Sequence, residues 1–206
     1  MLRPLVDDEE ELEALVELEG ATSGRLRAEA AGLPNMDPRE LTYRAWGGSM
    51  VNAAFSYVRH EGNRFNAPGR GAWYCAFREM TAVAEVGFHR TRELRRIDRF
   101  HDEAVYQVLL ADFIGRFHDL RSRSADDPRP ACLDPDPAVG YPAGQALAAR
   151  LRSLAEPSRG LIYPSLRQSG GECLVAFEPR VVQDVRLGAR WRLRWSGSPS
   201  FQVEQA

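Results

Sequence analysis

Hydrophobic and polar positions alternate with two different periods along the chain, one typical of helices and one typical of strands. Each change of period marks a predicted element. Leu12, Leu15 and Val16 recur at helical intervals within residues 7–19, after an acidic start that suits a helix N-terminus. We expect this helix to pack on the domain, with a partner-contacting extension as the alternative. A turn-rich GLPNMDPRE stretch then leads into LTYRAW (41–46), which predicts a first strand.

In the middle of the chain a strand-like pattern gives way to a helical one within a few residues. GAWYCAF (71–77) is short and aromatic and follows a glycine, which predicts a strand. Apolar residues then recur at helical spacing, which predicts a helix over 79–89. Segments 93–100 and 104–111 are predicted to be further strands.

The C-terminal part is predicted to be mainly strands. Residues 121–139 are rich in Pro and Asp and predict a loop, and QALAARLRSLAE (145–156) predicts a helix stopped by Pro157. Strands are expected at 160–165, 172–179, 181–187 and 191–196, the last with Trp and Leu alternating with Arg. Short strands interrupted by a few helices indicate an α+β fold in a single domain.

Composition fits a globular protein and argues against two classes of partner. The chain has 206 residues, 44% of them hydrophobic and 27% charged, which suits one domain with a substantial core. Its net charge is −2 and every basic residue is arginine, interspersed with acids, so direct nucleic-acid binding is not expected. No apolar run approaches membrane-spanning length, so we expect a cytoplasmic protein that binds no membrane.

The cysteines and histidines show no spacing typical of a metal site. Three cysteines, Cys75, Cys132 and Cys173, lie far apart and are expected to be reduced, with Cys75 and Cys173 buried in strands. The four histidines lack the H-E-x-x-H pattern, so no metal is expected.

A first group of candidate residues could bind phosphate. Arg44 follows the strand-like LTY, and Arg64 and Asn66 lie on the turn NRFNAPG. A guanidinium presents donors that match phosphate oxygens, and Gly69 and Gly71 allow a ligand to approach the backbone. Because neither a G-x-G-x-x-G nor a P-loop motif occurs, a Rossmann or P-loop nucleotide site is disfavoured.

A second group could act on a ring-bearing ligand. Tyr74 lies in the predicted strand and offers a flat face, while Glu85 lies eleven positions later among apolar neighbours on the predicted helix. A strand followed by a helix of that length can bring the two together. Ser165 follows a strand and a proline and could bond a phosphate or ribose oxygen. The alternatives remain open: Glu85 could form an ion pair with Arg90 or Arg92, and Ser165 could be an ordinary turn serine.

Together these pieces resemble the RES domain. The resemblance rests on Arg44 in TYRAW, the turn N-R-F-N-A-P-G, WYCA followed by T-A-V-A-E, and G-L-I-Y-P-S-L-R followed by E-C-L-V-A-F. The turn of the family usually reads G-R-W-N, so Asn63 and Phe65 are departures, although Phe keeps an aromatic face. By this resemblance the arginine of the family corresponds to Arg44. Its tyrosine, glutamate and serine correspond to Tyr74, Glu85 and Ser165.

The resemblance implies both a fold and an activity. It implies a RES domain (40–206) whose fold is similar to ADP-ribosyltransferases. The acidic N-terminus lies outside the resemblance, so we expect an N-terminal helical extension (1–39). The resemblance also implies a toxin-like enzyme that uses NAD as substrate, with Glu85, Arg44 and Tyr74 as catalytic residues and with Arg44, Arg64, Asn66, Tyr74 and Ser165 binding NAD. The expected reaction is cleavage of the nicotinamide–ribose bond, by a glycohydrolase or a phosphorylase. The alternatives are an ADP-ribosyltransferase that modifies a protein and a catalytically silent binding module. An Xre-like antitoxin is the partner implied, and a homodimer stays open.

Overall fold

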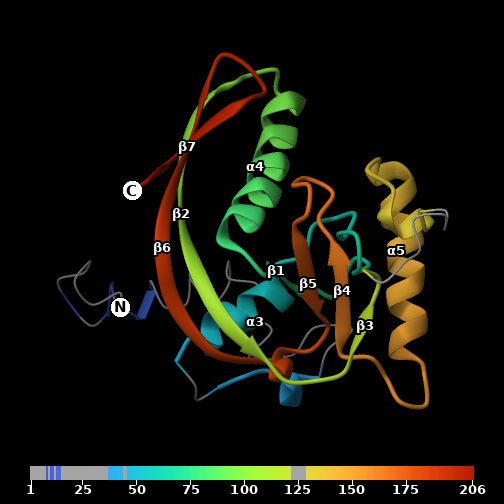
Figure 1. Ribbon diagram of the computed structural model, residues 1–206. Coiled ribbons are helices and arrows are strands. Elements are labelled where there is room, and N and C mark those ends of the chain that lie inside the picture. Colours follow the sequence, from blue (N-terminus) through green and yellow to red (C-terminus); the bar gives the residue numbers. More distant parts are fainter. Residues whose placement is uncertain (1–7, 9, 12, 15–36, 44–45, 122–128) are drawn as a thin grey trace.

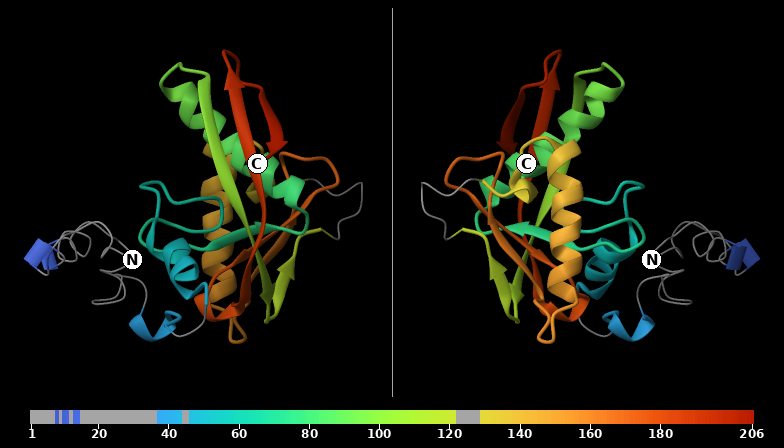
Figure 2. Two further views of the ribbon diagram at one scale, coloured as in Figure 1. Left: turned by 90° about the vertical axis from the view of Figure 1, so that its left-hand side faces the viewer. Right: turned by 90° about the vertical axis from the view of Figure 1, so that its right-hand side faces the viewer.

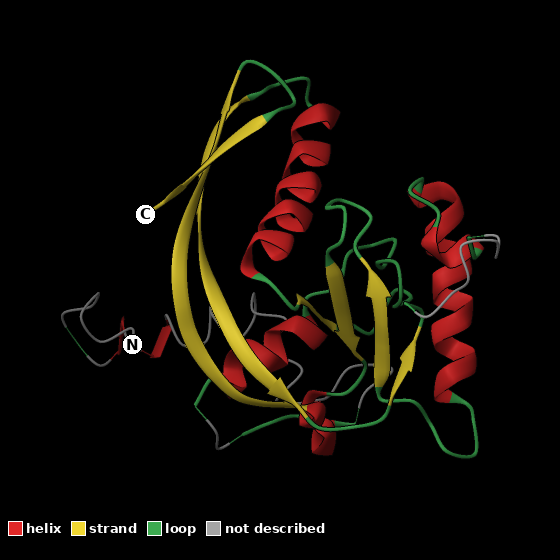
Figure 3. Ribbon diagram, in the orientation of Figure 1, coloured by secondary structure: helices red, strands yellow, loops and turns green. Residues whose placement is uncertain are grey.

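The computed structural model describes residues 8, 10–11, 13–14, 37–43, 46–121 and 129–206. Helices and strands are interspersed along the described chain, which confirms the α+β class (Figure 3). The described helices are α3 (Gly48–Ser56), α4 (Glu79–Arg96) and α5 (Pro137–Arg152), with short 3-10 turns η2 (Pro38–Glu40), η3 (Ala131–Leu133) and η4 (Pro179–Val181). The described strands are β1 (Trp73–Ala76), β2 (His101–Phe113), β3 (Phe117–Asp119), β4 (Gly160–Pro164), β5 (Glu172–Ala176), β6 (Val182–Ser196) and β7 (Phe201–Gln205). Most of the predicted N-terminal helix and extension lies outside the described residues.

A four-stranded sheet in the order β1–β5–β4–β3 forms the centre of the molecule. Its strands are antiparallel except for β3, which runs parallel to β4. Tyr74 pairs with Val175, and Cys173 pairs with both Ala76 and Tyr163. Because paired residues and alternate residues along a strand share a face, Tyr74, Cys173 and Tyr163 project from the same side of the sheet.

Helices cover both faces of this sheet (Figure 1). On one face, Ala148 and Leu151 of α5 pack against strand residues such as Leu161. On the other face, Val51 and Phe55 of α3 pack against β1 and β5, together with residues at the start of β6. The sheet is therefore the shared layer of two hydrophobic cores.

A second sheet, β2–β6–β7, curves around α4, and we call it the arch (Figure 1). Register shifts between Gln107 and Leu109 and between Leu110 and Asp112 interrupt the pairing of β2 with β6, and such irregularities bend a strand. The side views look onto the arch and onto α5, which therefore lie on opposite sides of the molecule (Figure 2). The alternation predicted at 191–196 is confirmed, since Leu193 and Trp195 are buried.

Helix α4 begins where predicted but continues to Arg96, so the strand predicted at 93–100 is wrong. The reason is that Thr91 and Leu94 continue the buried face that Val83 starts, and this face packs on the arch. The short apolar pattern at 93–100 therefore belongs to the last turn of the helix and the loop that follows. Among the described residues, no helix is long and apolar enough to cross a membrane.

The strand predicted at LTYRAW is also wrong for the residues of it that the structure describes, none of which lies in a strand. The amide of Thr42 donates to Asn52 Oδ1 at 2.9 Å, and Asn52 Nδ2 donates to the carbonyl of Thr42 at 3.0 Å. One buried side chain on α3 thus takes both backbone bonds that a neighbouring strand would take. Helix α3 was not predicted from the sequence.

Further differences concern the ends of elements. Helix α5 begins at Pro137, within the predicted loop, because the side chain of Asp136 accepts from the amide of Ala138 and caps the helix. It ends at Arg152, four residues before the predicted end. The strands predicted at 181–187 and 191–196 join into the single strand β6, and β3 and β7 were not predicted.

Candidate functional site

A cavity of about 470 Å³ lies among α4, α5, the central sheet and the turn that begins at Asn63. Its volume is in the range of small-molecule sites. Basic, acidic and aromatic groups all line it. The charged lining residues are Arg59, Arg64, Glu85, Arg90, Glu93 and Arg167, and the tyrosines are Tyr74, Tyr106, Tyr141 and Tyr163.

Helix α4 presents Glu85 to the cavity, and Ser165 holds its carboxylate. Ser165 Oγ donates to Glu85 Oε1 at 2.7 Å and accepts from the amides of Arg167 and Gln168, both at 3.1 Å. The hydroxyl is thereby fixed on three sides, and it orients the carboxylate instead of forming part of the cavity lining. The Cys173 thiol lies 3.8 Å from Glu85 Oε1, and burial followed by the charge of Glu85 raises its pKa to about 12.

The ion pairs considered as an alternative for Glu85 are not observed. Arg90 pairs with Asp102 of β2, with Nε 2.7 Å from Oδ2, and Arg92 Nη1 donates to the Tyr141 hydroxyl at 3.3 Å. In the part of the chain that the structure describes, no ion pair forms at Glu85. The carboxylate is therefore half-buried with hydroxyl and thiol partners, and its charge is available to a ligand.

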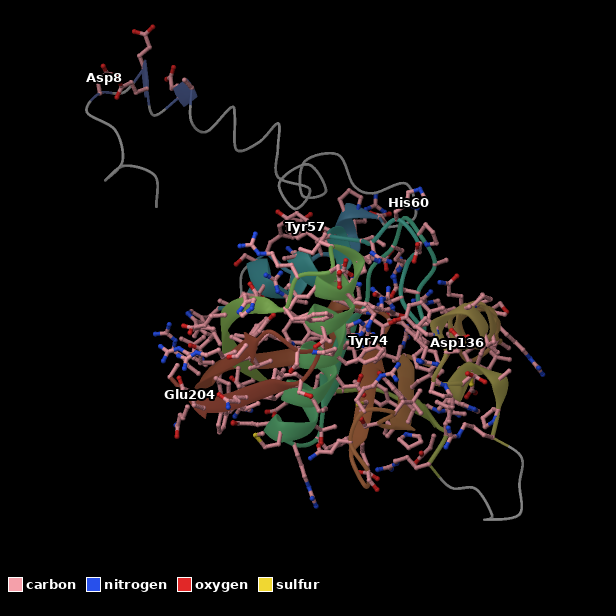
Figure 4. All side chains as sticks on the ribbon, turned by 90° about the horizontal axis from the view of Figure 1, so that it is seen from above. Asp8, Tyr57, His60, Tyr74, Asp136 and Glu204 are labelled. Carbon is pink, nitrogen blue, oxygen red and sulfur yellow. The ribbon has the colours of Figure 1, made fainter. Side chains whose placement is uncertain are left out.

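The strand tyrosine lines the same cavity as this carboxylate, and its hydroxyl is fixed. Tyr74 Oη donates to Asn66 Oδ1 at 2.8 Å and accepts from the amide of Phe65 at 2.9 Å. Burial of the hydroxyl raises the pKa of Tyr74, which keeps the phenol neutral. Figure 4 shows Tyr74 from above, near the centre of the molecule. The ring is therefore a fixed aromatic surface for a ligand.

Arg64 is 8% exposed and is held against α5. Its Nη1 donates to the carbonyls of Cys132 and Asp134 at 2.8 and 2.7 Å. Gly140 and Gly144 make this contact feasible, because a Cβ at Gly140 would lie 2.2 Å from Arg64 Nη1 and one at Gly144 would lie 2.2 Å from the Arg64 carbonyl oxygen. The guanidinium lines the cavity in a fixed orientation, as an anion site requires.

Asn66, one of the expected binding residues, does not line the cavity. Asn66 is completely buried, and its Nδ2 donates to the carbonyl of Arg70 at 2.9 Å. Its amide holds the turn and the Tyr74 hydroxyl and does not line the cavity. Arg44 lies outside the described residues.

Sequence reasoning missed several cavity residues, of which His89 is the clearest. It follows Glu85 by one helical turn, a spacing that could have indicated it. Burial, and then the positive charges of Arg59, Arg92, Arg167 and Arg64, lower its pKa to about 4. Its buried Nδ1 has no hydrogen-bond partner among the described residues. The imidazole is therefore neutral at pH 7.

Arg167 was also missed, because nothing in the sequence places the turn after β4 beside α4. Its guanidinium lies 3.4 Å from the centre of the Phe88 ring and lines the cavity. Burial lowers its pKa, although not enough to remove its charge at neutral pH. Arg64 and Arg167 thus place two guanidinium groups in the cavity that Glu85 also lines.

The described residues contain no group of three or more His, Cys, Asp or Glu side chains that could hold a metal ion. The groups of this site that are open to a ligand include the Glu85 carboxylate, the guanidinium groups of Arg64 and Arg167, the neutral imidazole of His89 and aromatic rings. Such a set can bind an anion and a flat ring and stabilise positive charge beside the carboxylate.

Comparison with known proteins gives the family. An uncharacterized protein, y4oC, from Sinorhizobium fredii (strain NBRC 101917 / NGR234) is 27% identical over 194 residues, which cover 92% of this chain and 75% of that protein. Residues 41–196 match the RES domain and include Arg64, Tyr74, Glu85 and Ser165. Since this match spans most of the chain, the protein belongs to the RES domain family.

Proposed function

We propose that this protein consumes NAD by cleaving the bond between nicotinamide and ribose. The observation that carries the proposal is the Glu85 carboxylate, oriented by Ser165 at 2.7 Å in a cavity that also contains fixed cationic groups. Membership of the RES family, which is linked to NAD-using toxins, supports the same substrate. NAD has a cationic nicotinamide ring and an anionic diphosphate, so a site for it needs both an anionic group and cationic groups.

In the proposed reaction, the C1′–N bond of the nicotinamide riboside breaks and its electron pair leaves with neutral nicotinamide. The ribose carbon gains oxocarbenium character, as in glycoside cleavage. The Glu85 carboxylate stabilises that charge and accepts a hydrogen bond from a ribose hydroxyl. An acceptor then bonds to C1′ and loses its proton, which gives ADP-ribose with water or ADP-ribose 1″-phosphate with phosphate.

The other cavity residues are assigned to binding. Arg64 and Arg167 hold the diphosphate, and the Tyr74 ring faces the nicotinamide. Binding energy from the adenosine diphosphate half then contributes to catalysis at the reacting half. Ser165 is a positioning residue, because its hydroxyl acts through Glu85.

The alternatives differ in acceptor or in activity. An ADP-ribosyltransferase would use a protein side chain as acceptor, and label transfer from NAD with a tagged adenine distinguishes it. A catalytically silent module would be favoured by a crowded Glu85 with no cavity beside Tyr74, whereas both residues line one cavity here. We further propose a toxin role with an Xre-like antitoxin as partner, which growth arrest on expression and rescue by such a protein would test.

The test is to incubate the purified protein with NAD, with and without phosphate, and to identify the products. We expect nicotinamide together with ADP-ribose or its 1″-phosphate, and a rate that falls at least about a hundredfold in Glu85→Gln with the fold unchanged. Undiminished activity in that variant, or no NAD loss in the wild type, would overturn the proposal.

A further inference from the structure

A second hollow adjoins the cavity and has no assigned role. It is a groove of about 490 Å³ between the C-terminal half of α4 and the start of α5. Tyr141 lines both the cavity and the groove. One wall carries Arg92 and Arg96 of α4, and the other carries Pro137, Ala138 and Pro142 of α5. Glu61 also lines the groove and lies 4.0 Å from Arg96, so the groove has a charged side and an apolar side.

Tyr141 lies between the cavity and the groove, and a guanidinium group lies near its ring on each side. The Arg64 guanidinium, which lines the cavity, lies 5.4 Å from the centre of the Tyr141 ring. The Arg92 guanidinium, which lines the groove, lies 5.7 Å from the same centre. A ligand that passes Tyr141 from cavity to groove thus meets two guanidinium groups at the crossing, where the anionic part of an extended molecule would be stabilised.

Helix α4 connects the two hollows along a single stripe. Glu85, His89, Arg92 and Arg96 follow one another at intervals of four, three and four residues, which places them on the same helix face. At 1.5 Å rise per residue, the stripe is roughly 16 Å long. The order along it is a carboxylate, a neutral imidazole and then two guanidinium groups, with the last two in the groove.

We propose that the groove binds the adenosine half of NAD, with the dinucleotide lying along α4. This inference rests on the proposed function. With the nicotinamide ribose at Glu85, the diphosphate lies at Arg64 and Arg167 and extends towards Arg92 at Tyr141, and the adenosine lies beyond it in the groove. The cavity alone has the volume of a single drug-sized ligand, so a dinucleotide extends past it.

The walls of the groove suit a nucleoside. The carbon surfaces of Pro137 and Ala138 face one side of the flat base, and the Arg96 side chain, 54% exposed and paired with Glu93 at 3.0 Å, faces the other. Asp136 lines the groove and caps α5 through one carboxylate oxygen, which accepts from the amide of Ala138 at 2.9 Å. A carboxylate in this place can also accept from a ribose hydroxyl. Figure 4 shows Asp136 on the α5 side of Tyr74.

The test compares NAD with nicotinamide mononucleotide, which lacks the adenosine half, in a variant whose groove is filled. Ala138→Trp places a large ring in the groove. The matched control is Val139→Trp, at a neighbouring α5 residue that is 47% exposed and does not line the groove. We expect kcat/KM for NAD to fall about tenfold or more in Ala138→Trp only, because the new ring fills the groove and removes the contacts of the adenosine half. We expect kcat/KM for the mononucleotide to stay unchanged in both variants.

Binding of AMP, measured by calorimetry, keeps the inference separate from the proposed function. The groove should bind AMP in the wild type and in Val139→Trp, and Ala138→Trp should weaken that binding about tenfold or more. If neither NAD nor the mononucleotide is consumed, the proposed function fails while AMP still tests the groove. Equal losses for NAD and the mononucleotide, or unchanged AMP binding in Ala138→Trp, would overturn the inference.

Discussion

The two sides of α4 differ in whether their buried polar groups have hydrogen-bond partners. On the arch side, Trp195 Nε1 donates to Thr91 Oγ1 at 2.9 Å, and Thr91 Oγ1 donates to the Pro199 carbonyl at 3.5 Å. These groups lie among buried apolar residues such as Leu193. On the cavity side, the buried Nδ1 of His89 has no hydrogen-bond partner among the described residues. The Thr91 and Trp195 groups on the arch side are hydrogen-bonded, whereas His89 Nδ1 on the cavity side has no partner among the described residues.

The difference separates stability from function along one helix. Apolar burial with paired polar groups stabilises a fold, whereas a buried polar group without a partner costs free energy. That cost persists on the cavity side, where Glu85 also carries a charge without an ion pair in the described chain. Substitutions on the arch side should therefore change the free energy of unfolding, and substitutions on the cavity side should change NAD turnover.

The largest expected effect is on stability at the arch. Trp195 is 2% exposed and packs against Phe201, with ring centres 5.2 Å apart. Trp195→Ala should lower the free energy of unfolding by about 3–5 kcal/mol, through lost packing and the lost hydrogen bond to the Thr91 hydroxyl. Denaturant unfolding measures this. The control Trp46→Ala removes a tryptophan that is 60% exposed and should cost about 0.5 kcal/mol or less. Similar losses in both variants would contradict the assignment of the arch as a core.

The next effect is a pH dependence of stability at His89. Its folded pKa is about 4, below the ordinary value of 6.5, so the folded protein binds this proton less tightly than the unfolded chain. The stability contributed by the neutral imidazole is complete above pH 6.5 and is lost as the pH falls towards 4. Between pH 7.5 and 4.5 the wild type should lose roughly 2 kcal/mol more than His89→Gln. Parallel losses in the two proteins, measured by denaturant unfolding, would show that His89 titrates normally.

A smaller effect is expected where α5 holds Arg64. Gly→Ala within a helix ordinarily stabilises by about 1 kcal/mol, but a Cβ at Gly140 would lie 2.2 Å from Arg64 Nη1 and 2.6 Å from the Asp134 carbonyl oxygen. Gly140→Ala should therefore displace the guanidinium and raise KM for NAD about tenfold. Val139→Ala, at the neighbouring exposed position, should leave KM unchanged. A stabilised Gly140→Ala variant with normal KM would contradict the assigned role of Arg64.

The elements that could be predicted from the sequence are those whose pattern is set locally. The strand that carries Tyr74 and the start of α4 were predicted correctly, because aromatic alternation and helical spacing are local signals. LTYRAW was misjudged because a distant side chain, Asn52, supplies its backbone partner. The end of α4 was misjudged because the burial of Leu94 depends on the arch.

The same division applies to the site. Glu85, Tyr74 and Ser165 were candidates from their sequence setting and matched the family resemblance. In the structure Glu85 and Tyr74 line one cavity, and Ser165 orients the Glu85 carboxylate. Arg167 could not be found, because its position depends on the packing of the β4–β5 turn against Phe88. Asn66 was expected to donate to a ligand, yet its side-chain amide is buried and bonds to the Arg70 carbonyl and the Tyr74 hydroxyl instead.

The most direct test of the central claim compares two carboxylates on α4. Glu85 lines the cavity, whereas Glu79 lies on the arch side, where its Oε2 accepts from Trp191 Nε1 at 3.2 Å. The measurement is the rate of nicotinamide release from NAD by the wild type, Glu85→Gln and Glu79→Gln, each checked for folding. We predict that the rate falls at least about a hundredfold in Glu85→Gln and keeps the wild-type value in Glu79→Gln. Equal rates in the two variants would contradict the claim that the cavity side of α4 carries the reaction.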